Sequence, residues 1–444
     1  MVRRTSSLPK RWWVAVEWIE ALIREGAKRV EEIEIYYVEG TSVSADLKRQ
    51  HVSLCSSSRD CGLCIRTVIK GRIGSSSTND PEQWRACLEA AIASGNLATS
   101  QTWEGLPYPA EVPGADLSFD PSLQVEPKLS RDLLSSLLAG AAKYPDAAIT
   151  SGSAGLARGT VTLANSHGIR YTYRHTGISV SLEAITGQST GYEFDHASFR
   201  DKVDPQSVGE RAAFFASRSA GGKDIVTSEY DIILSPIAYA DLLSNVFVPA
   251  LSGRNVHQGR SRLEGKIGEA VTSPGISMFD DPHISRANGS AWWDAEGTPT
   301  RRVDFIRDGI LEQFAYDLKT AYRFGKTTTG SAVRGGFTGI PSIGHHNFVV
   351  DGKREEIADE RAVYVHSVVG AHTANPMSGD FSVEIGNPFW MEAGEFAAPI
   401  RSAMLAGNVF ELHREIAGLG RESRAIGSYI LPPIRVNKQH IIGK

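Results

Sequence analysis

Histidine is the residue type whose placement first raises the question of metal chemistry in this chain. Four of the histidines gather late in the sequence, at His345, His346, His366 and His372. Neutral imidazole is a common metal ligand, so folding could bring several of these side chains to one ion. A local zinc motif would instead place two histidines one helical turn apart with a glutamate beside the metal-bound water. No histidine here is followed by glutamate, so that motif is absent. A metal site that uses His345, His346 or His372 remains an alternative that only folding could assemble.

The cysteines are the second candidate for metal or redox chemistry. Cys61 and Cys64 have the C-x-x-C spacing of half a zinc site or of a redox pair. A zinc ribbon needs a second pair downstream, and the other cysteines, Cys55 and Cys87, do not supply one. The surrounding residues indicate a strand that runs into a turn, which favours small buried thiols in a reducing compartment. The role of Cys61 and Cys64 stays open at this point.

Nucleophile and phosphate-binding motifs are also missing. The sequence contains neither the G-x-S-x-G elbow of serine hydrolases nor the G-x-x-x-x-G-K-[ST] loop that cradles phosphates. Asp380, in PMSGDFS, follows a Ser-Gly pair, which predicts a tight turn whose carboxylate caps backbone N–H groups. Direct contact between Asp380 and a substrate is the alternative.

The overall charge excludes some classes of partner. The 444 residues include 47 Lys and Arg against 51 Asp and Glu, for a formal net charge of −4. This balance gives no electrostatic case for binding nucleic acid or an anionic membrane. Near the N-terminus, Glu17 and Glu20 interrupt the apolar residues, which argues against a signal peptide or a membrane span. We therefore expect a cytoplasmic protein.

The elements that position these residues follow from the hydrophobic patterns of the first half. Helical spacing predicts helices over residues 11–25, Ser130–Ala141 and about 205–219. Between them, alternating runs predict strands, with a hairpin at Lys70-Gly71 and a turn at residues 165–168. The first half is therefore expected to be helices on a β-sheet.

The second half has a different pattern. The charged, glycine-containing stretch 217–225 predicts a boundary between an N-terminal domain, residues 1–220, and a C-terminal domain, residues 221–444. Asp308-Gly309 and Asp351-Gly352 predict type I′ hairpins, because both central residues of that turn need positive φ. The expected class is a two-domain α+β fold whose C-terminal domain is an antiparallel-rich curled sheet or barrel.

Several blocks of the chain resemble those of the TldD/PmbA family. In the second half they are GRSRLEGKIGE, HHNFVV, NPMSGDFSVEIGNPFWMEAGE and SAMLAGNVFELHREI; in the first half they are GLCIRTVIKGRIGSSSTND and TLANSHGIRYTYRHT. The resemblance covers nearly the whole chain, and the order of the blocks is specific. In this family the TldD type carries a His-Glu-x-x-x-His helix, completed by a distal cysteine, that holds the catalytic metal. The TldE (PmbA) type is similar throughout but lacks these ligands.

The resemblance implies that this chain is of the TldE type. The segment expected to carry the ligands reads SNVFVPALSGRNV, residues 244–256, and no cysteine follows Cys87. The implied role is a subunit with no catalytic residue or cofactor of its own, paired in a heterodimer with a TldD-type metallopeptidase subunit that holds zinc. Such a complex would cut peptides or unfolded small proteins, and extended substrates would be held by strand addition.

Four residues in the family-like blocks are candidates for lining the substrate cleft: His346, Asn347, Asp380 and Ser382. The alternative is that they only organise hairpin turns. Two other functions stay open beside the heterodimer. One is a peptide-binding or assembly homodimer without catalysis, and the other is a peptidase with an unrecognised histidine-based metal site.

Overall fold

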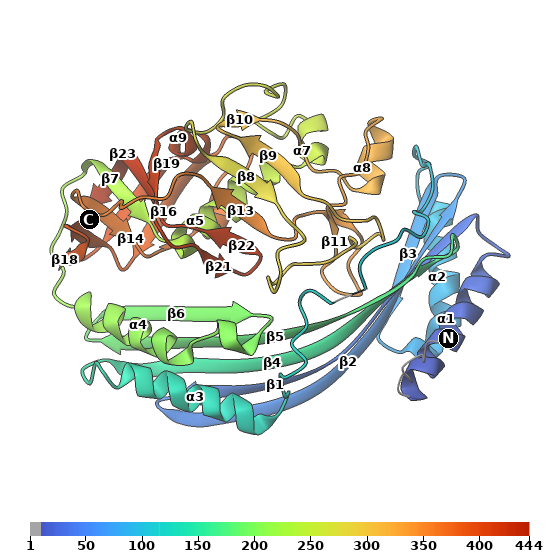
Figure 1. Ribbon diagram of the computed structural model, residues 1–444, viewed down its shortest axis with the longest axis horizontal. Helices are drawn as coiled ribbons and strands as arrows, with labels where there is room; N and C mark the ends of the chain where they lie inside the picture. The colour runs from blue at the N-terminus through green and yellow to red at the C-terminus, as the bar shows by residue number, and fades with distance from the viewer. Residues whose placement is uncertain (1–9, 115, 444) are drawn as a thin grey trace, which may run out of the picture.

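The computed structural model describes residues 10–114 and 116–443, and its first half is built on one long antiparallel sheet. The strands lie in the order β3-β2-β1-β4-β5-β6 and curve across the lower part of Figure 1. Their bounds are β1 (Glu32–Lys48), β2 (His51–Ile69), β3 (Arg72–Thr78), β4 (Ala148–Asn165), β5 (Arg170–Thr186) and β6 (Ser189–Ala197). The two family-like blocks of the first half, on β2–β3 and β4–β5, therefore belong to a single sheet.

The turns between these strands lie where the sequence predicts them. Lys70 and Gly71, with φ of 51° and 69°, connect β2 to β3. Between β4 and β5, the Asn165 side chain accepts hydrogen bonds from the N–H groups of His167 and Ile169, both at 3.0 Å. A short polar side chain that closes a turn in this way replaces backbone hydrogen bonds that the chain cannot make there. Both turn predictions are confirmed.

Helices cover the two ends of the sheet (Figure 1). At one end are α1 (Lys10–Gly26), the short η1 (Pro81–Gln83) and α2 (Trp84–Leu97); at the other are α3 (Pro127–Ala141), η2 (Arg200–Lys202) and α4 (Pro205–Arg218). The α3–α4 crossing depends on two glycines. A Cβ atom on Gly140 would lie 1.9 Å from the Gln206 carbonyl oxygen, and one on Gly209 would lie 1.9 Å from that of Leu137. Any larger residue would force the helices apart.

The predicted helices over 11–25 and 205–219 are confirmed, but the predicted start of the helix at Ser130 is wrong. Helix α3 begins at Pro127, after Glu126 in extended conformation. Proline suits the first turn because its fixed φ is already helical and its missing N–H has no intrahelical partner there. Ser130 is instead buried inside the helix, where its hydroxyl donates to the Pro127 carbonyl at 3.1 Å.

The second half contains two larger sheets and a two-stranded one. The nine-stranded sheet has the order β15-β16-β19-β23-β7-β14-β17-β18, with β20 also paired to β23; the six-stranded sheet has the order β10-β9-β8-β13-β22-β21, and β11 pairs with β12. Most neighbours are antiparallel, and β14 with β7 and β13 with β22 are the parallel pairs among the described residues. The curled α+β architecture is the expected one.

The bounds of the C-terminal strands are β7 (Ser228–Leu234), β8 (Ser277–Asp280), β9 (Val303–Arg307), β10 (Ile310–Leu311), β11 (Ala332–Val333), β12 (Ser342–Ile343), β13 (Phe348–Asp351), β14 (Ala362–Val365), β15 (Ser367–Val369), β16 (Asp380–Gly386), β17 (Phe389–Glu392), β18 (Glu395–Pro399), β19 (Ala403–Asn408), β20 (Ile416–Leu419), β21 (Arg424–Ile426), β22 (Tyr429–Leu431) and β23 (Ile434–Gly443). The helical segments are α5 (Pro236–Leu242), the π turn η3 (Leu243–Phe247), α6 (Val248–Ala250), α7 (Gly253–His257), α8 (Leu318–Arg323), η4 (Ala371–Thr373) and α9 (Val409–Arg414).

One of the two predicted C-terminal hairpins is confirmed and the other is wrong. Asp308 and Gly309 have φ of 49° and 85° and connect β9 to β10. Asp351 and Gly352 do not have positive φ, and the chain beyond them does not return along β13. Strand β13 pairs with β8 and β22, so both of its edges are already occupied and no hairpin partner can add there.

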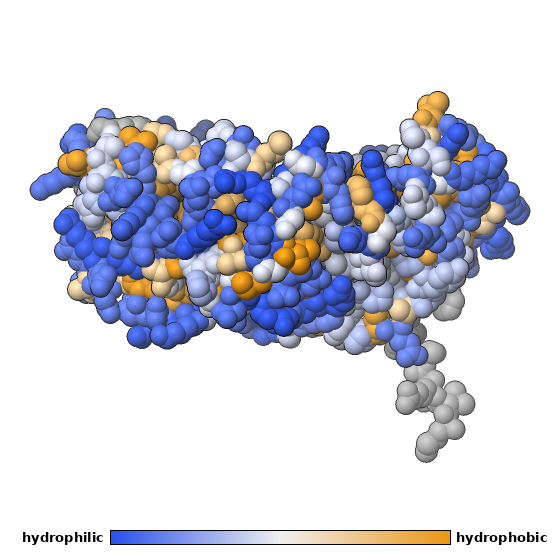
Figure 2. Space-filling model, turned by 90° about the horizontal axis from the view of Figure 1, so that it is seen from above, coloured by the Kyte–Doolittle hydropathy of each residue, from blue (hydrophilic) through white to orange (hydrophobic). Residues whose placement is uncertain are grey.

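The C-terminal half lies along the β6 side of the N-terminal sheet (Figure 1). Its core is one large cluster that includes Phe247 on η3, Phe348 on β13 and Val436 on β23. Seen from above, the surface is largely hydrophilic, with hydrophobic residues in small scattered patches (Figure 2). No helix in residues 10–114 and 116–443 is both long enough and apolar enough to cross a bilayer. The boundary between residues 220 and 221 stays a prediction.

Candidate functional site

The segment that the family resemblance singles out is a broken helix in the structure. Ser235 caps the start of α5, where its hydroxyl accepts hydrogen bonds from the N–H groups of Ile237 and Ala238. The helix then widens into the π turn Leu243–Phe247 before α6 begins. Pro249 explains the widening, because its ring would clash with the carbonyl four residues earlier in a regular α-helix. Single π turns inside helices frequently mark functional sites.

The donors along this segment do not fit a hydrolytic zinc ion. Such an ion needs three protein ligands held around one open position. Residues 239–256 contain one ionisable side chain that could serve, Asp241, whose pKa burial raises to about 6. The next imidazole, His257, stacks on Phe324 and lies 3.2 Å from the Tyr316 hydroxyl. Among the described residues, no group of three His, Cys, Asp or Glu side chains converges on a common point.

A cleft of about 570 Å³ opens along the same segment, and we call it the basic cleft. One side is formed by residues of α6, α7 and the turn that follows, including Arg254 and Arg260; the other is formed by β9, β12, β13 and β22. No aspartate or glutamate is among its lining residues. Its volume falls within the range of small-ligand sites, which combine apolar walls with a few polar groups.

Two side chains of the basic cleft come from elements far apart in sequence. His345 follows β12, and its Nε2 atom lies 3.0 Å from the Ser428 hydroxyl, while burial lowers the pKa of its imidazole. Tyr429 lies next to this pair and packs against the rings of His345 and Phe348. Burial raises the pKa of Tyr429, so its hydroxyl is protonated at neutral pH and can donate a hydrogen bond.

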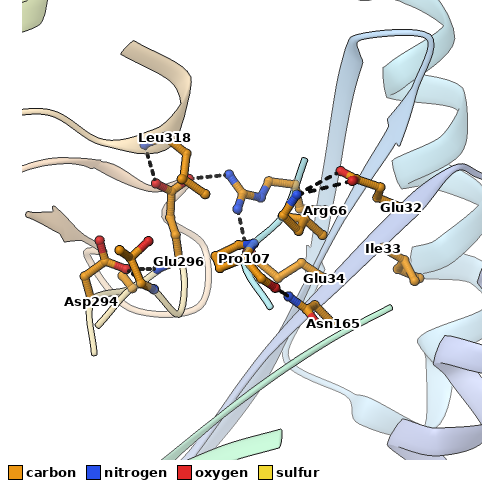
Figure 3. A network of polar contacts seen from close by, with 12 residues as sticks. Glu32, Ile33, Glu34, Arg66, Pro107, Asn165, Asp294, Glu296 and Leu318 are labelled. Carbon is orange, nitrogen blue, oxygen red and sulfur yellow. Dashed lines mark hydrogen bonds and ion pairs between the residues drawn. The ribbon is translucent and has the colours of Figure 1, made fainter. Parts of the chain in front are cut away.

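A cluster of buried charges lies where the two halves of the chain meet (Figure 3). Arg66 on β2 stands between Glu34 on β1 and Glu296 of the second half, with a distance of 2.7 Å between its Nη1 atom and Glu296 Oε1. Arg334 pairs with the other oxygen of Glu34. All four side chains are at most 5% exposed. We call these four residues the junction cluster.

Burial shifts the acidic groups of this region. Burial raises the pKa of Glu296 to about 7, although Arg66 acts in the opposite direction, and it raises the pKa of Asp294 to about 6. Perturbed carboxyl groups can mark a catalytic acid or base. Here the contacts are internal, since Glu296 accepts hydrogen bonds from Arg66 and from the Leu318 N–H, and Asp294 accepts from the Ala332 N–H. The cluster therefore holds loops and strands together.

A second cavity, of about 820 Å³, lies between β6 and the C-terminal half. Glu193 on β6 is fully buried beside it and pairs with Arg211 on α4 and Arg424 on β21. Burial alone would raise the pKa of Glu193, but the two guanidinium groups lower it below its usual range. This ion-pair group joins the halves of the chain at a second point.

The predicted residues His346 and Asn347 lie side by side in a buried hydrogen-bond network. The backbone N–H groups of both donate to Asp280, at 2.9 and 2.7 Å, and the His346 ring lies 3.3 Å from the same carboxylate. The Asn347 side-chain amide donates to the Asp281 carbonyl and the Ser290 hydroxyl. Asn347 also lies on the wall of the 820 Å³ cavity. A role for either residue in substrate binding stays a prediction.

The predicted residues Asp380 and Ser382 lie apart from that pair, on the exposed side of β16. The Asp380 carboxylate accepts a hydrogen bond of 2.8 Å from the Asn408 side chain, which lowers its pKa. The prediction that this carboxylate caps backbone N–H groups is wrong. Asn375 performs that function, since its side chain accepts from the N–H groups of Met377 and Ser378. Contact of Asp380 or Ser382 with substrate stays a prediction.

The C-x-x-C thiols do not form a pair. Both lie on β2, where side chains three positions apart point to opposite faces of the sheet. Cys64 is buried, and burial raises the pKa of its thiol, whereas Cys61 is only partly exposed and lies 3.6 Å from the Asn79 carbonyl. Cys55, near the start of the same strand, is exposed.

Comparison with known proteins identifies the family. Models of the PmbA/TldA metallopeptidase match three successive parts of the chain: domain 1 over residues 33–95, the central domain over residues 120–220 and the C-terminal domain over residues 227–443. The chain belongs to the TldD/PmbA family.

Individual relatives agree over most of their length. An uncharacterized protein of Methanocaldococcus jannaschii is 32% identical to this TldD/PmbA chain over 89% of it and 93% of the relative. Metalloprotease PmbA of Escherichia coli O157:H7 is 24% identical over 95% and 96%. The crystal structure of TldE from Thermococcus kodakarensis superposes with a TM-score of 0.88 at 27% identity, covering 96% of this chain and all of that one. The predicted family and the TldE type are confirmed.

Sequence patterns alone do not single out Arg254, Arg260 or Tyr429, which the fold gathers in the basic cleft of this TldD/PmbA protein. A signal exists in the letters GRNVHQGR, where two arginines occur with no carboxylate between them. That pattern is common on exposed surfaces. Only the strands that form the opposite wall turn it into a concave site.

Proposed function

We propose that this protein is the metal-free, TldE-like subunit of a heterodimeric metallopeptidase that cuts peptides or unfolded small proteins. Its partner is a TldD-type subunit that holds zinc and breaks the peptide bond. The present chain contributes one wall of the enclosed substrate cleft. The main support for this proposal is the structure of the segment from Ser235 to Arg260. This segment forms a broken helix beside a cleft and contains no set of residues that could bind zinc.

Three further observations support the proposal. The family models that match are those of metallopeptidases, and the matches continue through all three of their domains. The polar residues of the basic cleft include no carboxylate that could act as the general base of a hydrolase. The four cysteines are free thiols in the structure, which agrees with the cytoplasmic location that we propose.

The experiment is co-expression of this chain with the TldD-type protein of the same organism. We expect a complex of one copy of each, bound zinc, and cleavage of an unstructured peptide that a chelator stops. This chain alone should bind no stoichiometric zinc and cleave nothing. The matched control replaces the His-Glu-x-x-x-His glutamate of the partner by glutamine, which should leave assembly intact and remove cleavage.

Two results would overturn the proposal, and each points to one of the alternatives. Chelator-sensitive cleavage by the isolated chain, lost on substitution of His345, His346 or His372, would indicate a histidine-based metal site. A stable homodimer that ignores the partner and binds peptides without cleaving them would indicate a non-catalytic binding or assembly protein. No observation in the described part of the chain favours either one.

A further inference from the structure

The two arginines of the basic cleft have no acidic partner among the described residues. The guanidinium groups of Arg254 and Arg260 are exposed, and neither has an ion pair or a side-chain hydrogen bond within residues 10–114 and 116–443. Because no carboxylate lines the cleft, both positive charges act on whatever enters it. A concave site with low-dielectric walls concentrates such a potential, so it attracts an anionic group.

Uncharged donors accompany the two arginines. Ser252 and Gln258 belong to the same wall, and Tyr429 belongs to the opposite one. None of the three has a side-chain hydrogen-bond partner among the described residues. Unpartnered polar groups around a cavity are those that a ligand can satisfy, because the protein has not already used them.

The rest of the cleft is apolar. Val248, Ile343 and the Tyr429 ring are among the partly exposed apolar groups on its surface, and they pack against the C-terminal core. Behind them, Phe305 and Phe348 are almost fully buried and fix the position of the wall. The cleft therefore has a site for an anion next to a site for an apolar group.

A peptide that ends in an apolar residue can fill the anion site and the apolar site with its last residue alone. Its terminal carboxylate and its last side chain are attached to the same Cα atom. Guanidinium groups match a carboxylate in geometry as well as charge, since the planar fork donates two parallel hydrogen bonds. The remaining donors can serve the carbonyl of the preceding peptide unit. An acidic side chain within a peptide lacks the adjoining apolar group, and inorganic phosphate lacks it altogether.

We propose that the basic cleft binds the free C-terminal carboxylate of a peptide, with Arg254 and Arg260 on the carboxylate and the Val248–Ile343–Tyr429 wall on an apolar last side chain. This inference rests on the proposed function in taking a peptide as the ligand. It adds that this subunit recognises one end of the substrate, so that the partner's metal acts on the part of the chain that extends away from the cleft.

The test measures binding to the full-length chain without its partner. The probe is a six-residue peptide with a fluorophore at its N-terminus and leucine with a free carboxylate at its C-terminus, followed by fluorescence anisotropy. Its comparison probes are the same peptide with a C-terminal amide, the amide with an internal aspartate, and the free-carboxylate peptide ending in serine. Inorganic phosphate is added as a competitor. We expect the leucine carboxylate to bind at least about tenfold more tightly than the two amide peptides, since a charge-assisted hydrogen bond contributes about tenfold or more. It should also bind at least about tenfold more tightly than the serine carboxylate, because burial of a leucine side chain contributes about that much.

Substitutions assign the effect to the cleft. Arg254→Gln and Arg260→Gln should each weaken binding of the leucine carboxylate by about tenfold, and the double variant should bind carboxylate and amide equally. Arg301→Gln is the matched control, because Arg301 is an exposed arginine of the same half that does not line the cleft. It should bind like the unaltered protein. Circular dichroism of each variant checks that the fold is retained.

Any of the following results would overturn the inference: equal binding of carboxylate and amide, equal binding of the leucine and serine carboxylates, binding that survives the double variant, an internal aspartate that binds as tightly as the free terminus, or no measurable binding. Displacement by phosphate at concentrations near the peptide's own Kd would assign the site to phosphate and would also overturn it. Failure here is distinguishable from failure of the proposed function. A heterodimer that contains zinc and cleaves peptides can exist with no carboxylate preference, and the isolated chain can show the preference with no active heterodimer.

Discussion

The junction cluster and the basic cleft each contain two arginines, but in opposite surroundings. Arg66 and Arg334 are buried, and carboxylates from both halves of the chain accept their hydrogen bonds. Arg254 and Arg260 are exposed on the wall of a cleft that has no carboxylate. Taking a charge out of water is costly unless a partner compensates, so the buried arginines are committed to the fold. The exposed arginines cost the fold little and remain free for a ligand.

Of the substitutions in these two regions, we expect Arg66→Met to have the largest effect on the free energy of unfolding. This substitution removes the cation that Glu34 and Glu296 share, so Glu296 loses its ion pair with Arg66 and Glu34 keeps only its pair with Arg334. Breaking a buried pair by removing one partner typically costs about 3–5 kcal/mol. We expect a loss of that size in the free energy of unfolding, measured by urea denaturation. Arg421→Met is the control, because Arg421 is exposed and its nearest carboxylate oxygen, on Glu356, is 4.0 Å away. A loss below about 1 kcal/mol for Arg66→Met would show that the cluster does not hold the halves together.

The next effect is a dependence on pH. Burial raises the pKa of Glu296 from 4.5 to about 7, so between these values the folded state binds the proton more tightly than the unfolded state does. Stability from this group is therefore present below about pH 4.5 and is lost as the pH rises through about 7. Relative to Glu296→Gln, the unaltered protein should lose at most about 3 kcal/mol between about pH 5 and about pH 8.

The control for this measurement is Glu395→Gln, which changes an exposed glutamate and should keep the pH slope of the unaltered protein. Asp294, with a pKa raised to about 6, acts in the same direction and contributes to the slope that remains in Glu296→Gln. Identical slopes in Glu296→Gln and the unaltered protein would mean that Glu296 stays ionised throughout, with Arg66 compensating its burial fully.

The smallest effect concerns the basic cleft. Arg254→Gln and Arg260→Gln should each change the free energy of unfolding by no more than about 0.5 kcal/mol, because neither guanidinium group has a partner to lose among the residues that the structure describes. Urea denaturation of both variants beside the unaltered chain measures this. A loss above about 1 kcal/mol would mean that these arginines stabilise the fold, and the contrast with the junction cluster would then disappear.

The two regions also differ in how far the sequence predicts them. Local signals set the turns at Lys70-Gly71, residues 165–168 and Asp308-Gly309, because positive φ and short polar side chains act within a few residues. The same signal fails at Asp351-Gly352, where β8 and β22 already pair with both edges of β13. The residues of a turn determine which backbone conformations a segment can adopt. The pairing of the neighbouring strands determines whether the hairpin forms.

The sequence by itself determined the family, the α+β class and the lack of zinc ligands between residues 244 and 256, since each depends on residue types in order along the chain. Only the tertiary structure decided which arginines pair with buried carboxylates and which are available to a ligand. Arg66 meets Glu296, 230 residues away, while Arg254 and Tyr429 line a cleft that has no Asp or Glu among its lining residues. The reason is physical: the cost of a charge depends on burial and on its neighbours, and folding supplies both from distant parts of the chain.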